Sequence, residues 1–245
     1  MDKDLIVREF YRIKELGFVK SRRQNNTGIG KTFEDYLGVK ENNDKAPDFA
    51  GFEVKSKRAK STSYLTLFTK SPSVPKKANT YLRDTYGDAY EENPDLKKIH
   101  TSIFSDKYNT YRDLFQFKII NDANSERVVI NIKDISSGQI DSSVYWTYKE
   151  LETCLIEKMK ALFFVYAETQ IIDGTEHFHY TNADIYLNPS LKNLLKFIDD
   201  GKLMIDIRIG SYKTGKSKGK THDHGTGFRI KPCDLTSLYE KHIQV

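Results

Sequence analysis

The chain has 245 residues, of which 38% are apolar and 30% charged, and it contains 15 Tyr and 14 Phe. A disordered chain has fewer aromatic residues, so we expect a globular protein with one large core or two lobes. No apolar run approaches the roughly 20 residues of a membrane-spanning helix, so we expect no membrane association and a cytoplasmic location. The two cysteines, Cys154 and Cys233, lack a Cys-x-x-Cys spacing and are expected to be reduced.

The formal net charge of +5 is unevenly distributed. Eleven Lys or Arg residues, and no acidic residue, fall in the three segments 20–23, 55–60 and 213–220. Three such segments on separate elements can follow one polyanionic backbone, which indicates a nucleic acid as partner. For any one segment, a solvated loop is the simpler interpretation.

Periodicity and turn residues predict the elements of the first half. They are helices over 3–16 and about 30–37, a hairpin over 47–57 and a strand over 64–70. Gly17 and Gly38 follow the two helices as expected end residues, and Ala50-Gly51 forms the expected hairpin turn. Residues 76–113 are polar and Tyr-rich and give no clear pattern.

In the second half, strands and helices alternate. The expected elements are strands over 115–120 and 126–132, a helix over 147–159, strands over 162–169 and 177–187, a helix over 189–199, a strand over 203–212, a basic loop and a short helix. We therefore expect an α/β protein with a mixed sheet and flanking helices. No linker marks a boundary, so the two lobes are expected over mainly 1–120 and 121–245, with interleaving possible.

The segment NTGIGKTFEDYLG (26–38) ends like a nucleotide-binding loop. Such a loop needs a glycine where this chain has Asn25, and an apolar strand where it has KSRRQNN, so ATP or GTP binding is disfavoured. The segment instead predicts a helix that carries Glu34 beside an apolar stripe. Taken alone, Glu34 is an ordinary surface acid, and we expect Lys31 to meet a DNA phosphate.

Two carboxylates and a lysine meet in PDFAGFEVKSK (47–57). Side chains alternate along a strand, so Glu53 and Lys55 share one face, and Asp48 can return to that face across the turn. Two carboxylates can hold a hard cation such as Mg²⁺, and a lysine beside them suits phosphodiester hydrolysis. Because this pattern is short and has many chance matches, a solvated hairpin is an equal alternative until the neighbouring basic segment is considered.

A second constellation lies near the C-terminus. Its polar members are Asp206, Arg208, Lys213, His222, Asp223, His224 and Arg229. Arginine bonds the guanine edge and aspartate accepts from the cytosine amino group, so the set can read G·C pairs. A zinc site at His222 and His224 with Cys233 is disfavoured because no fourth ligand has a recognisable spacing. For the two histidines, DNA contact and loop scaffolding stay open, whereas contact is favoured for the arginines.

These segments resemble the MvaI/BcnI family of type II restriction endonucleases, and its MvaI branch in particular. The resemblance rests on TGIGKTFEDYLG, APDFAGFEVKSK, LTLFTKSP, SVYW and DIRIGSYKTGKSKGKTHDHGTGFRI, which occur in this order from residue 27 to 230. Residues 83–113 have no match. The resemblance implies a PD-(D/E)xK nuclease fold of the MutH-like type, in which a catalytic lobe and a recognition lobe form a cleft for duplex DNA.

The resemblance also implies roles for individual residues. Asp48 and Glu53 would be metal ligands, Lys55 would position or activate water, and Glu34 would complete the acidic site. Expected base contacts are Asp206, Arg208, His222, His224 and Arg229, and Lys213, Asp223 and Lys31 are further expected DNA contacts.

A member of this family is expected to be a monomer that uses Mg²⁺ and cuts CC-N-GG sites, here with a central A or T, to leave a 5′-phosphate. The resemblance also implies a cognate DNA methyltransferase as a genetic companion and not as a binding partner. Two alternatives are a repair nickase of the MutH type and a DNA-binding module without catalysis.

Overall fold

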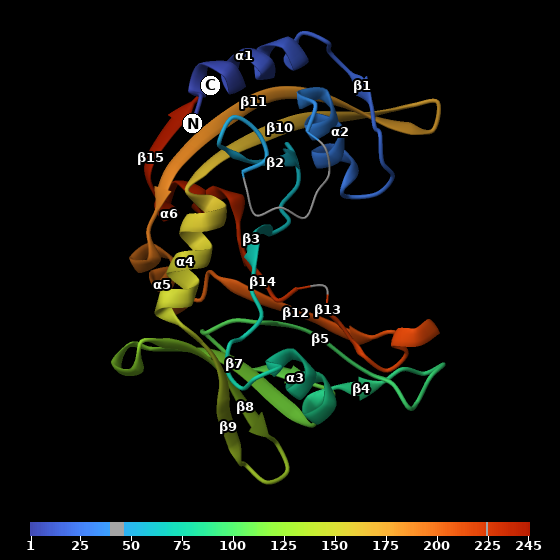
Figure 1. The fold of residues 1–245 in the computed structure, drawn as a ribbon, viewed down its shortest axis with the longest axis vertical. Helices are drawn as coiled ribbons and strands as arrows, with labels where there is room; N and C mark the ends of the chain where they lie inside the picture. Colours follow the sequence, from blue (N-terminus) through green and yellow to red (C-terminus); the bar gives the residue numbers. More distant parts are fainter. Residues whose placement is uncertain (40–46, 224) are drawn as a thin grey trace. The chain divides into compact units, whose positions relative to one another are not determined.

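The computed structural model describes residues 1–39, 47–223 and 225–245 (Figure 1). The chain folds into two compact units, each assembled from separate segments. Unit 1 consists of Met1–Ser63, Leu155–Ser190 and Cys233–Val245, and unit 2 consists of Tyr64–Cys154 and Leu191–Pro232. This division differs from the expected split near residue 120, because strands that pair within each unit come from distant parts of the sequence.

Unit 1 is built on a mixed sheet of five strands in which β1 and β15 both pair with β11. The strands are β1 (Val19–Lys20), β2 (Glu53–Arg58), β10 (Ala161–Ile172), β11 (Thr175–Pro189) and β15 (Tyr239–Gln244). β2 runs parallel to β10, whereas the other pairs are antiparallel. β2 thus joins the sheet only through β10, which is otherwise part of the long β10–β11 hairpin.

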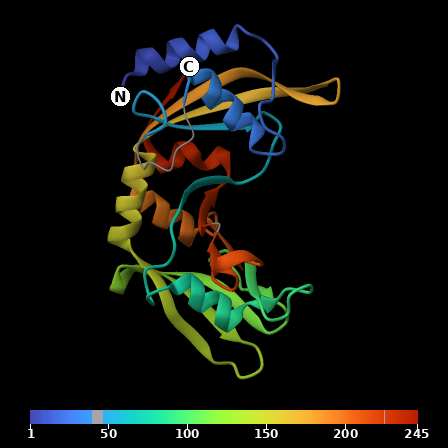
Figure 2. The ribbon, with the colours of Figure 1, turned by 45° about the vertical axis from the view of Figure 1, so that its right-hand side comes forward.

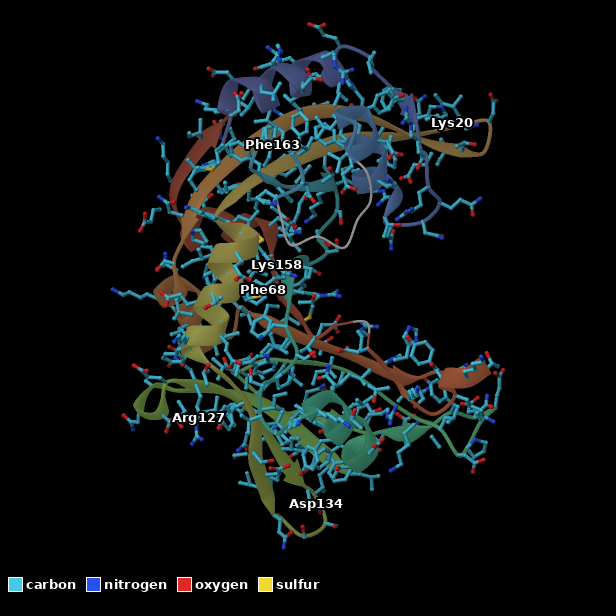
Figure 3. All side chains as sticks on the ribbon, viewed as in Figure 1. Lys20, Phe68, Arg127, Asp134, Lys158 and Phe163 are labelled. Carbon is cyan, nitrogen blue, oxygen red and sulfur yellow. The ribbon has the colours of Figure 1, made fainter. Side chains whose placement is uncertain are left out.

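Two helices, α1 (Lys3–Lys14) and α2 (Gly28–Leu37), cover one face of this sheet, as Figures 1 and 2 show. Asp2 caps α1 by accepting a hydrogen bond from Leu5 N at 2.9 Å, and Gly38 ends α2 with a left-handed φ of 77°. Phe33 of α2 and Phe163 of β10, the latter labelled in Figure 3, are fully buried in the core between the helices and the sheet. This packing fixes the position of β2 beneath the helices.

Unit 2 contains two sheets. In the first, the strand order is β3 (Leu65–Thr69), β14 (Gly227–Ile230), β12 (Met204–Ser211), β5 (Lys97–Ile103) and β4 (Asp88–Ala89), with β13 (Thr221–Asp223) paired to β12. The second has the order β6 (Asn109–Tyr111), β7 (Phe115–Asp122), β8 (Arg127–Asp134) and β9 (Ile140–Thr147). All pairs are antiparallel.

The remaining helical elements are short. In the described residues they are α3 (Ala78–Tyr86), α5 (Leu191–Asp199), α6 (Leu235–Leu238) and three single-turn 3₁₀ helices, Ala123–Ser125, Gly215–Ser217 and Pro232–Asp234; α4 (Tyr148–Met159) is longer, with 12 residues. Among the described residues, no helix is long and apolar enough to cross a membrane. Cys154 is buried, Cys233 is exposed, and both are free thiols, as expected.

The strongly periodic elements expected from the sequence are confirmed, with ends shifted by a few residues. The unassigned stretch 76–113 contains α3, β4, β5 and β6, and β9 and β15 were not expected. β4 and β6 have only two and three residues, and β5 and β15 pair with strands far away in the sequence. β9 pairs with the neighbouring strand β8, but its first half is mostly exposed. The α/β class of the protein and its mixed sheet are as expected.

Candidate functional site

A two-residue turn brings the first candidate residues together in unit 1. Phe49 and Phe52 form an isolated antiparallel bridge, with Phe52 N donating to Phe49 O at 2.8 Å. Ala50 and Gly51 between them both have positive φ, 51° and 84°, as a type I′ hairpin turn requires. The expected Ala50-Gly51 turn is confirmed, and it returns the chain so that Asp48 lies beside the start of β2.

Asp48 is tied to β2 by its own side chain. Its Oδ2 accepts a hydrogen bond from Val54 N at 2.8 Å. Partial burial of the carboxylate raises the pKa of Asp48 above its ordinary value, and the negative charge of nearby Glu53 raises it further. The hydrogen bond from Val54 and the charge of Lys55 oppose this shift of the pKa. Two carboxylates therefore sit close enough to repel each other at this bend.

Glu53 and Lys55 share a face of β2, as the alternation predicts. Lys55 Nζ lies 2.8 Å from Glu53 Oε1, and both side chains are partly exposed. Val54 points the other way and is 5% exposed in the core. In the parallel ladder, Leu162 pairs with Glu53 and Phe164 with Lys55, so both candidate residues lie beside the fully buried part of β10. The backbone beneath the pair is thus fixed by the sheet.

Tyr239, at the start of β15, is a neighbour of this site that sequence reasoning missed. It is 6% exposed, and its hydroxyl is buried without a hydrogen-bond partner among the described residues. Burial raises the pKa of Tyr239 well above its ordinary value, and the charge of Glu53 contributes. No motif marks this tyrosine, because it is 186 positions away from Glu53 and meets it only through the fold.

The donor set of this site suits a hard divalent cation. Asp48 and Glu53 supply carboxylate oxygens whose mutual repulsion a cation would relieve, and Mg²⁺ is commonly held by one or two carboxylates together with water. Within the described part of the chain, no group of three or more His, Cys, Asp or Glu residues is placed to hold a metal. The fit therefore rests on two carboxylates, and Glu34 is not brought into a three-residue cluster with them.

Glu34 and Lys31 both lie on α2. Glu34 is partly buried, and its charge helps to raise the pKa of Tyr180 after the larger effects of burial and of Tyr36. Lys31 Nζ lies 2.7 Å from Asp35 Oδ1, and the lysine side chain is only 17% exposed. The expected roles of Glu34 in the acidic site and of Lys31 at a phosphate remain predictions, and Lys31 already has a carboxylate partner.

In unit 2, Asp206 organises the second candidate set. It is 1% exposed and accepts hydrogen bonds from Ser102 Oγ at 2.8 Å and from Arg208 Nε at 3.1 Å. Arg229 Nη2 approaches its second oxygen at 2.9 Å. Both oxygens of Asp206 are buried and bonded within the protein, and its expected contact with a base remains a prediction. In this structure Asp206 holds two arginines in place.

Arg208 lies on β12 and Arg229 on β14, and both side chains bond to Asp206. Their side chains are 50% and 32% exposed, so both keep access to solvent while bonded to Asp206. Gly227 makes room for one of them, since a Cβ at this position would lie 3.0 Å from Arg229 Nε. The arrangement leaves two guanidinium groups, each bonded to Asp206, on the same face of the sheet.

The other candidate residues of unit 2 lie in the segment that follows β12 and in β13. Asp223 accepts from Ser71 Oγ at 3.1 Å, from Gly225 N at 2.7 Å and from Asn79 Nδ2, so its carboxylate is used within the protein. His222 stacks on Tyr212 with ring centroids 4.4 Å apart. His224 lies outside the described residues.

Lys213 lies 4.7 Å above the ring of Tyr90 and 4.0 Å from Glu92 Oε2. Its side chain is 48% exposed, so part of the charge faces solvent. Lys213 is thus available to a ligand although it rests on an aromatic ring.

Comparisons with known proteins show the family of this chain. The sequence model of the MvaI/BcnI restriction endonuclease family matches residues 7–239. A solved structure described as restriction endonuclease MvaI in complex with cognate DNA substrate has 36% sequence identity and a TM-score of 0.89, covering 100% of this chain and 99% of that one. The structure of MvaI in the absence of DNA has 35% identity and a TM-score of 0.67, with 100% and 98% coverage. No curated protein sequence matched.

A mixed α/β protein that matches a restriction endonuclease along its whole length belongs to the class of type II site-specific endonucleases. The chain is a member of the MvaI/BcnI restriction endonuclease family. The expected family and the PD-(D/E)xK fold type are thereby confirmed.

Proposed function

We propose that this enzyme hydrolyses phosphodiester bonds of double-stranded DNA at a short CC-N-GG site with a central A or T, using Mg²⁺ and leaving a 5′-phosphate. The observation that carries the proposal is the coupling of Asp48, Glu53 and Lys55 at one bend: two repelling carboxylates beside an ammonium group. This combination of charges suits a phosphodiester and a divalent cation better than it suits an ordinary surface hairpin.

Duplex DNA is proposed as the substrate because the related MvaI, 36% identical, was solved with its cognate DNA. The proposal includes a monomeric enzyme in the cytoplasm and a cognate methyltransferase that protects host DNA without binding this chain. A repair nickase of the MutH type is disfavoured by membership in a restriction endonuclease family.

Asp48 and Glu53 would hold the divalent cation. When bound, such a cation supplies positive charge that stabilises the anionic oxygens on phosphorus and lowers the pKa of water at the site. Lys55 contributes a fixed ammonium group, because its bond to Glu53 holds Nζ on the catalytic face of β2. From there it can orient the attacking water and offset charge that develops on the phosphate.

The proposed chemistry is an in-line displacement. The water oxygen forms a bond to phosphorus as the bond from phosphorus to the 3′-oxygen breaks. The leaving 3′-oxygen takes up a proton, so the products are a 3′-hydroxyl and a 5′-phosphate. The chain supplies orientation and fixed charge for this step, and it forms no covalent intermediate.

Arg208 and Arg229 are the proposed base readers. A guanidinium group can bond both O6 and N7 of guanine in the major groove, and two such groups on one face of a sheet suit a site rich in G·C pairs. Asp206 is proposed to orient them by bonding Arg208 at Nε and Arg229 at Nη2. His222, Lys213 and Asp223 are proposed to shape and charge the neighbouring loop, with His224 as a further candidate contact.

Digestion of a plasmid of known sequence, with Mg²⁺ and the purified chain alone, tests this function directly. Sequencing of the ends should show cuts in both strands at CC-A/T-GG sites, each with a 5′-phosphate. Cutting of one strand only, with a requirement for a partner protein, would instead support a repair nickase. Absence of cutting across diverse DNA with Mg²⁺ or Mn²⁺ would refute the proposal.

A further inference from the structure

One basic segment found in the sequence forms a closed loop in unit 2. Residues 212–220, here called the lysine loop, carry four lysines and no acidic residue. Tyr212 N donates to Lys220 O at 3.0 Å, and Gly219 N donates to Tyr212 O at 2.9 Å, so the two ends of the loop are bonded to each other. The loop follows β12 directly, and β12 carries Asp206 and Arg208.

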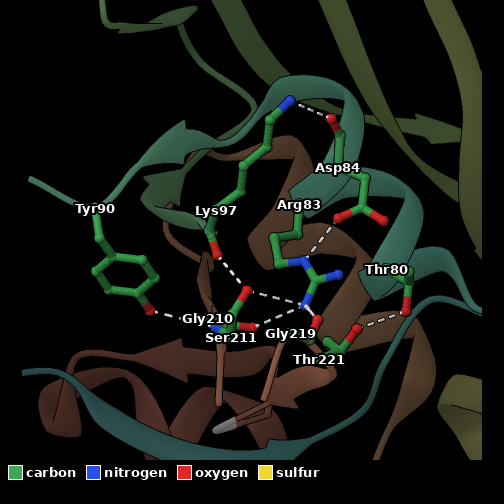
Figure 4. A network of polar contacts seen from close by, with 9 residues as sticks. All are labelled: Thr80, Arg83, Asp84, Tyr90, Lys97, Gly210, Ser211, Gly219 and Thr221. Carbon is green, nitrogen blue, oxygen red and sulfur yellow. Dashed lines mark hydrogen bonds and ion pairs between the residues drawn. The ribbon is translucent and has the colours of Figure 1, made fainter. Parts of the chain in front are cut away.

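A buried arginine lies at the base of this loop (Figure 4). The side chain of Arg83, from α3, is only 7% exposed. Its Nη1 donates to Ser211 Oγ at 3.1 Å, to Gly219 O at 3.3 Å and to Gly210 O at 3.4 Å. One guanidinium nitrogen thus contacts the chain both where it enters the loop and where it leaves it.

Other residues around Arg83 also form hydrogen bonds at the ends of the lysine loop (Figure 4). Ser211 Oγ donates to Lys97 O at 2.7 Å, and the hydroxyls of Thr80 and Thr221 are 2.7 Å apart. Tyr90 OH accepts from Ser211 N at 3.3 Å, and its oxygen would lie 2.5 Å from a Cβ at Gly210. Position 210 therefore has no room for a side chain.

Arg83 itself is held by the end of α3. Its Nε donates to Asp84 Oδ1 at 2.8 Å. Gly87 follows the helix, and a Cβ there would lie 2.3 Å from Arg83 O and 2.6 Å from Lys98 O, so the helix end packs directly on β5. The segment 83–98, which matched no family motif, forms the support of the lysine loop.

The guanidinium group of Arg83, at the base of a loop with four lysines, adds charge repulsion. We therefore infer that its hydrogen bonds, and not its charge, are what the loop needs. A guanidinium group presents several donors in a fixed plane, so it can bond several carbonyl and hydroxyl acceptors at once, which an ammonium group does with less geometric control. A loop ordered in advance gives up less conformational freedom when it binds a ligand. The hydrogen bonds of Arg83 thus order the lysine loop, although its charge repels the lysines.

We propose that Arg83 is a positioning residue for DNA binding: it fixes the lysine loop so that Lys213, Lys216, Lys218 and Lys220 meet phosphates of the duplex backbone as a preformed set. This inference rests on the proposed function in taking duplex DNA as the ligand. It assigns phosphate contact to the whole loop and leaves the reading of bases to β12 and β14.

The variants for the test are Arg83→Met, Arg83→Lys and the double variant Lys216→Ala/Lys218→Ala. Arg127→Met is the matched control, since Arg127 also belongs to unit 2 and bonds an aspartate, Asp122, at 3.0 Å, away from the loop. Limited trypsin digestion reports loop order without DNA, because trypsin cuts after the loop lysines. The dissociation constant for a duplex that carries the mapped site is then measured against salt concentration, with KM and kcat alongside.

For Arg83→Met we expect faster trypsin cleavage within 212–220 and a raised KM with kcat unchanged. The slope of its salt dependence should fall by about 1 for each phosphate that the loop no longer binds. Arg83→Lys should restore part of each property. The double lysine variant should lower the slope by about 2 without faster proteolysis outside the loop. Arg127→Met should match the wild type in all of these measurements.

Unchanged proteolysis and an unchanged salt slope in Arg83→Met would overturn the proposal, as would failure of both Arg83 variants to fold, which would make Arg83 a residue for stability alone. An unchanged slope in the double lysine variant would remove the loop from the DNA interface. If the wild type binds no duplex at all, the proposed function fails, while the trypsin result still reports whether Arg83 orders the loop.

Discussion

Arg229 Nη2 lies 2.9 Å from Oδ2 of Asp206, a carboxylate that is only 1% exposed. The same carboxylate also accepts from Arg208 Nε. An aspartate that the sequence suggested as a base contact is therefore the buried anchor of two arginines. The consequence is that specificity in unit 2 should depend on a residue that need not touch DNA.

Asp206→Asn should weaken binding to the cognate duplex more than binding to random DNA. The asparagine side chain lacks the charge that holds both guanidinium groups, and loss of a buried partner costs about 3 kcal/mol of folding stability. Urea unfolding and competitive gel-shift titration measure the two effects. Asp200→Asn removes an exposed partner of Lys196 and should change stability by less than about 1 kcal/mol. Equal loss on both DNA types would argue against an anchoring role.

Arg208→Lys and Arg229→Lys should relax the choice of sequence while cutting persists. Lysine keeps the charge but cannot make the bidentate contact with guanine, a difference of about 1 to 3 kcal/mol per base. Sequencing of cleavage ends from a randomised library would show the positions at which each variant accepts other bases. If both variants kept the full wild-type specificity, these arginines would not be the base readers.

Lys55→Met should abolish cutting and leave DNA binding nearly intact. The ammonium group bonded to Glu53 is proposed to act on the water and the phosphate, and loss of such a group typically lowers the rate by about 10² to 10⁴. Single-turnover cleavage and gel shift on one duplex separate the two steps. Lys241→Met, at an exposed lysine of β15 outside the three basic segments, is the control and should cut at near the wild-type rate.

The raised pKa of Asp48 predicts a pH-dependent cost to folding. A carboxyl whose folded pKa is raised binds its proton more tightly in the folded state, so its stabilising effect is full below the unfolded pKa and is lost as pH rises through the folded pKa. Without divalent cations, Asp48→Asn should therefore gain thermal stability over the wild type at about pH 7 and lose that gain at about pH 3.

The raised pKa of Asp48 also predicts how the need for Mg²⁺ changes with pH. If Asp48 holds Mg²⁺ as proposed, protons compete with the cation, and the Mg²⁺ concentration for half-maximal cutting should fall as pH rises through the raised pKa. An Asp48→Asn variant that is less stable than the wild type at neutral pH would contradict the repulsion between Asp48 and Glu53.

The geometry of the bend that holds Asp48, Glu53 and Lys55 was predicted from the sequence because its determinants are local. Strand alternation placed Glu53 and Lys55 on one face, and a turn signal returned Asp48 to it. The anchoring role of Asp206 was not predictable, because Ser102, one of its partners, is 104 positions away. For Arg83 the sequence gives only a weak indication of burial, because it lies four residues after Asn79 on the same face of α3. The oxygen atoms that accept its hydrogen bonds come from residues far away in the sequence, so its role could not be predicted.

The proposed function depends most on the proposal that Glu53 serves phosphodiester cleavage and not the stability of the fold. Wild type and Glu53→Gln are compared on one labelled duplex with Mg²⁺, with binding measured by gel shift and cutting measured in a single turnover. We expect the variant to bind within a few-fold of the wild type and to release no 5′-phosphate ends. Loss of binding together with cutting, or cutting at the wild-type rate, would contradict the assignment.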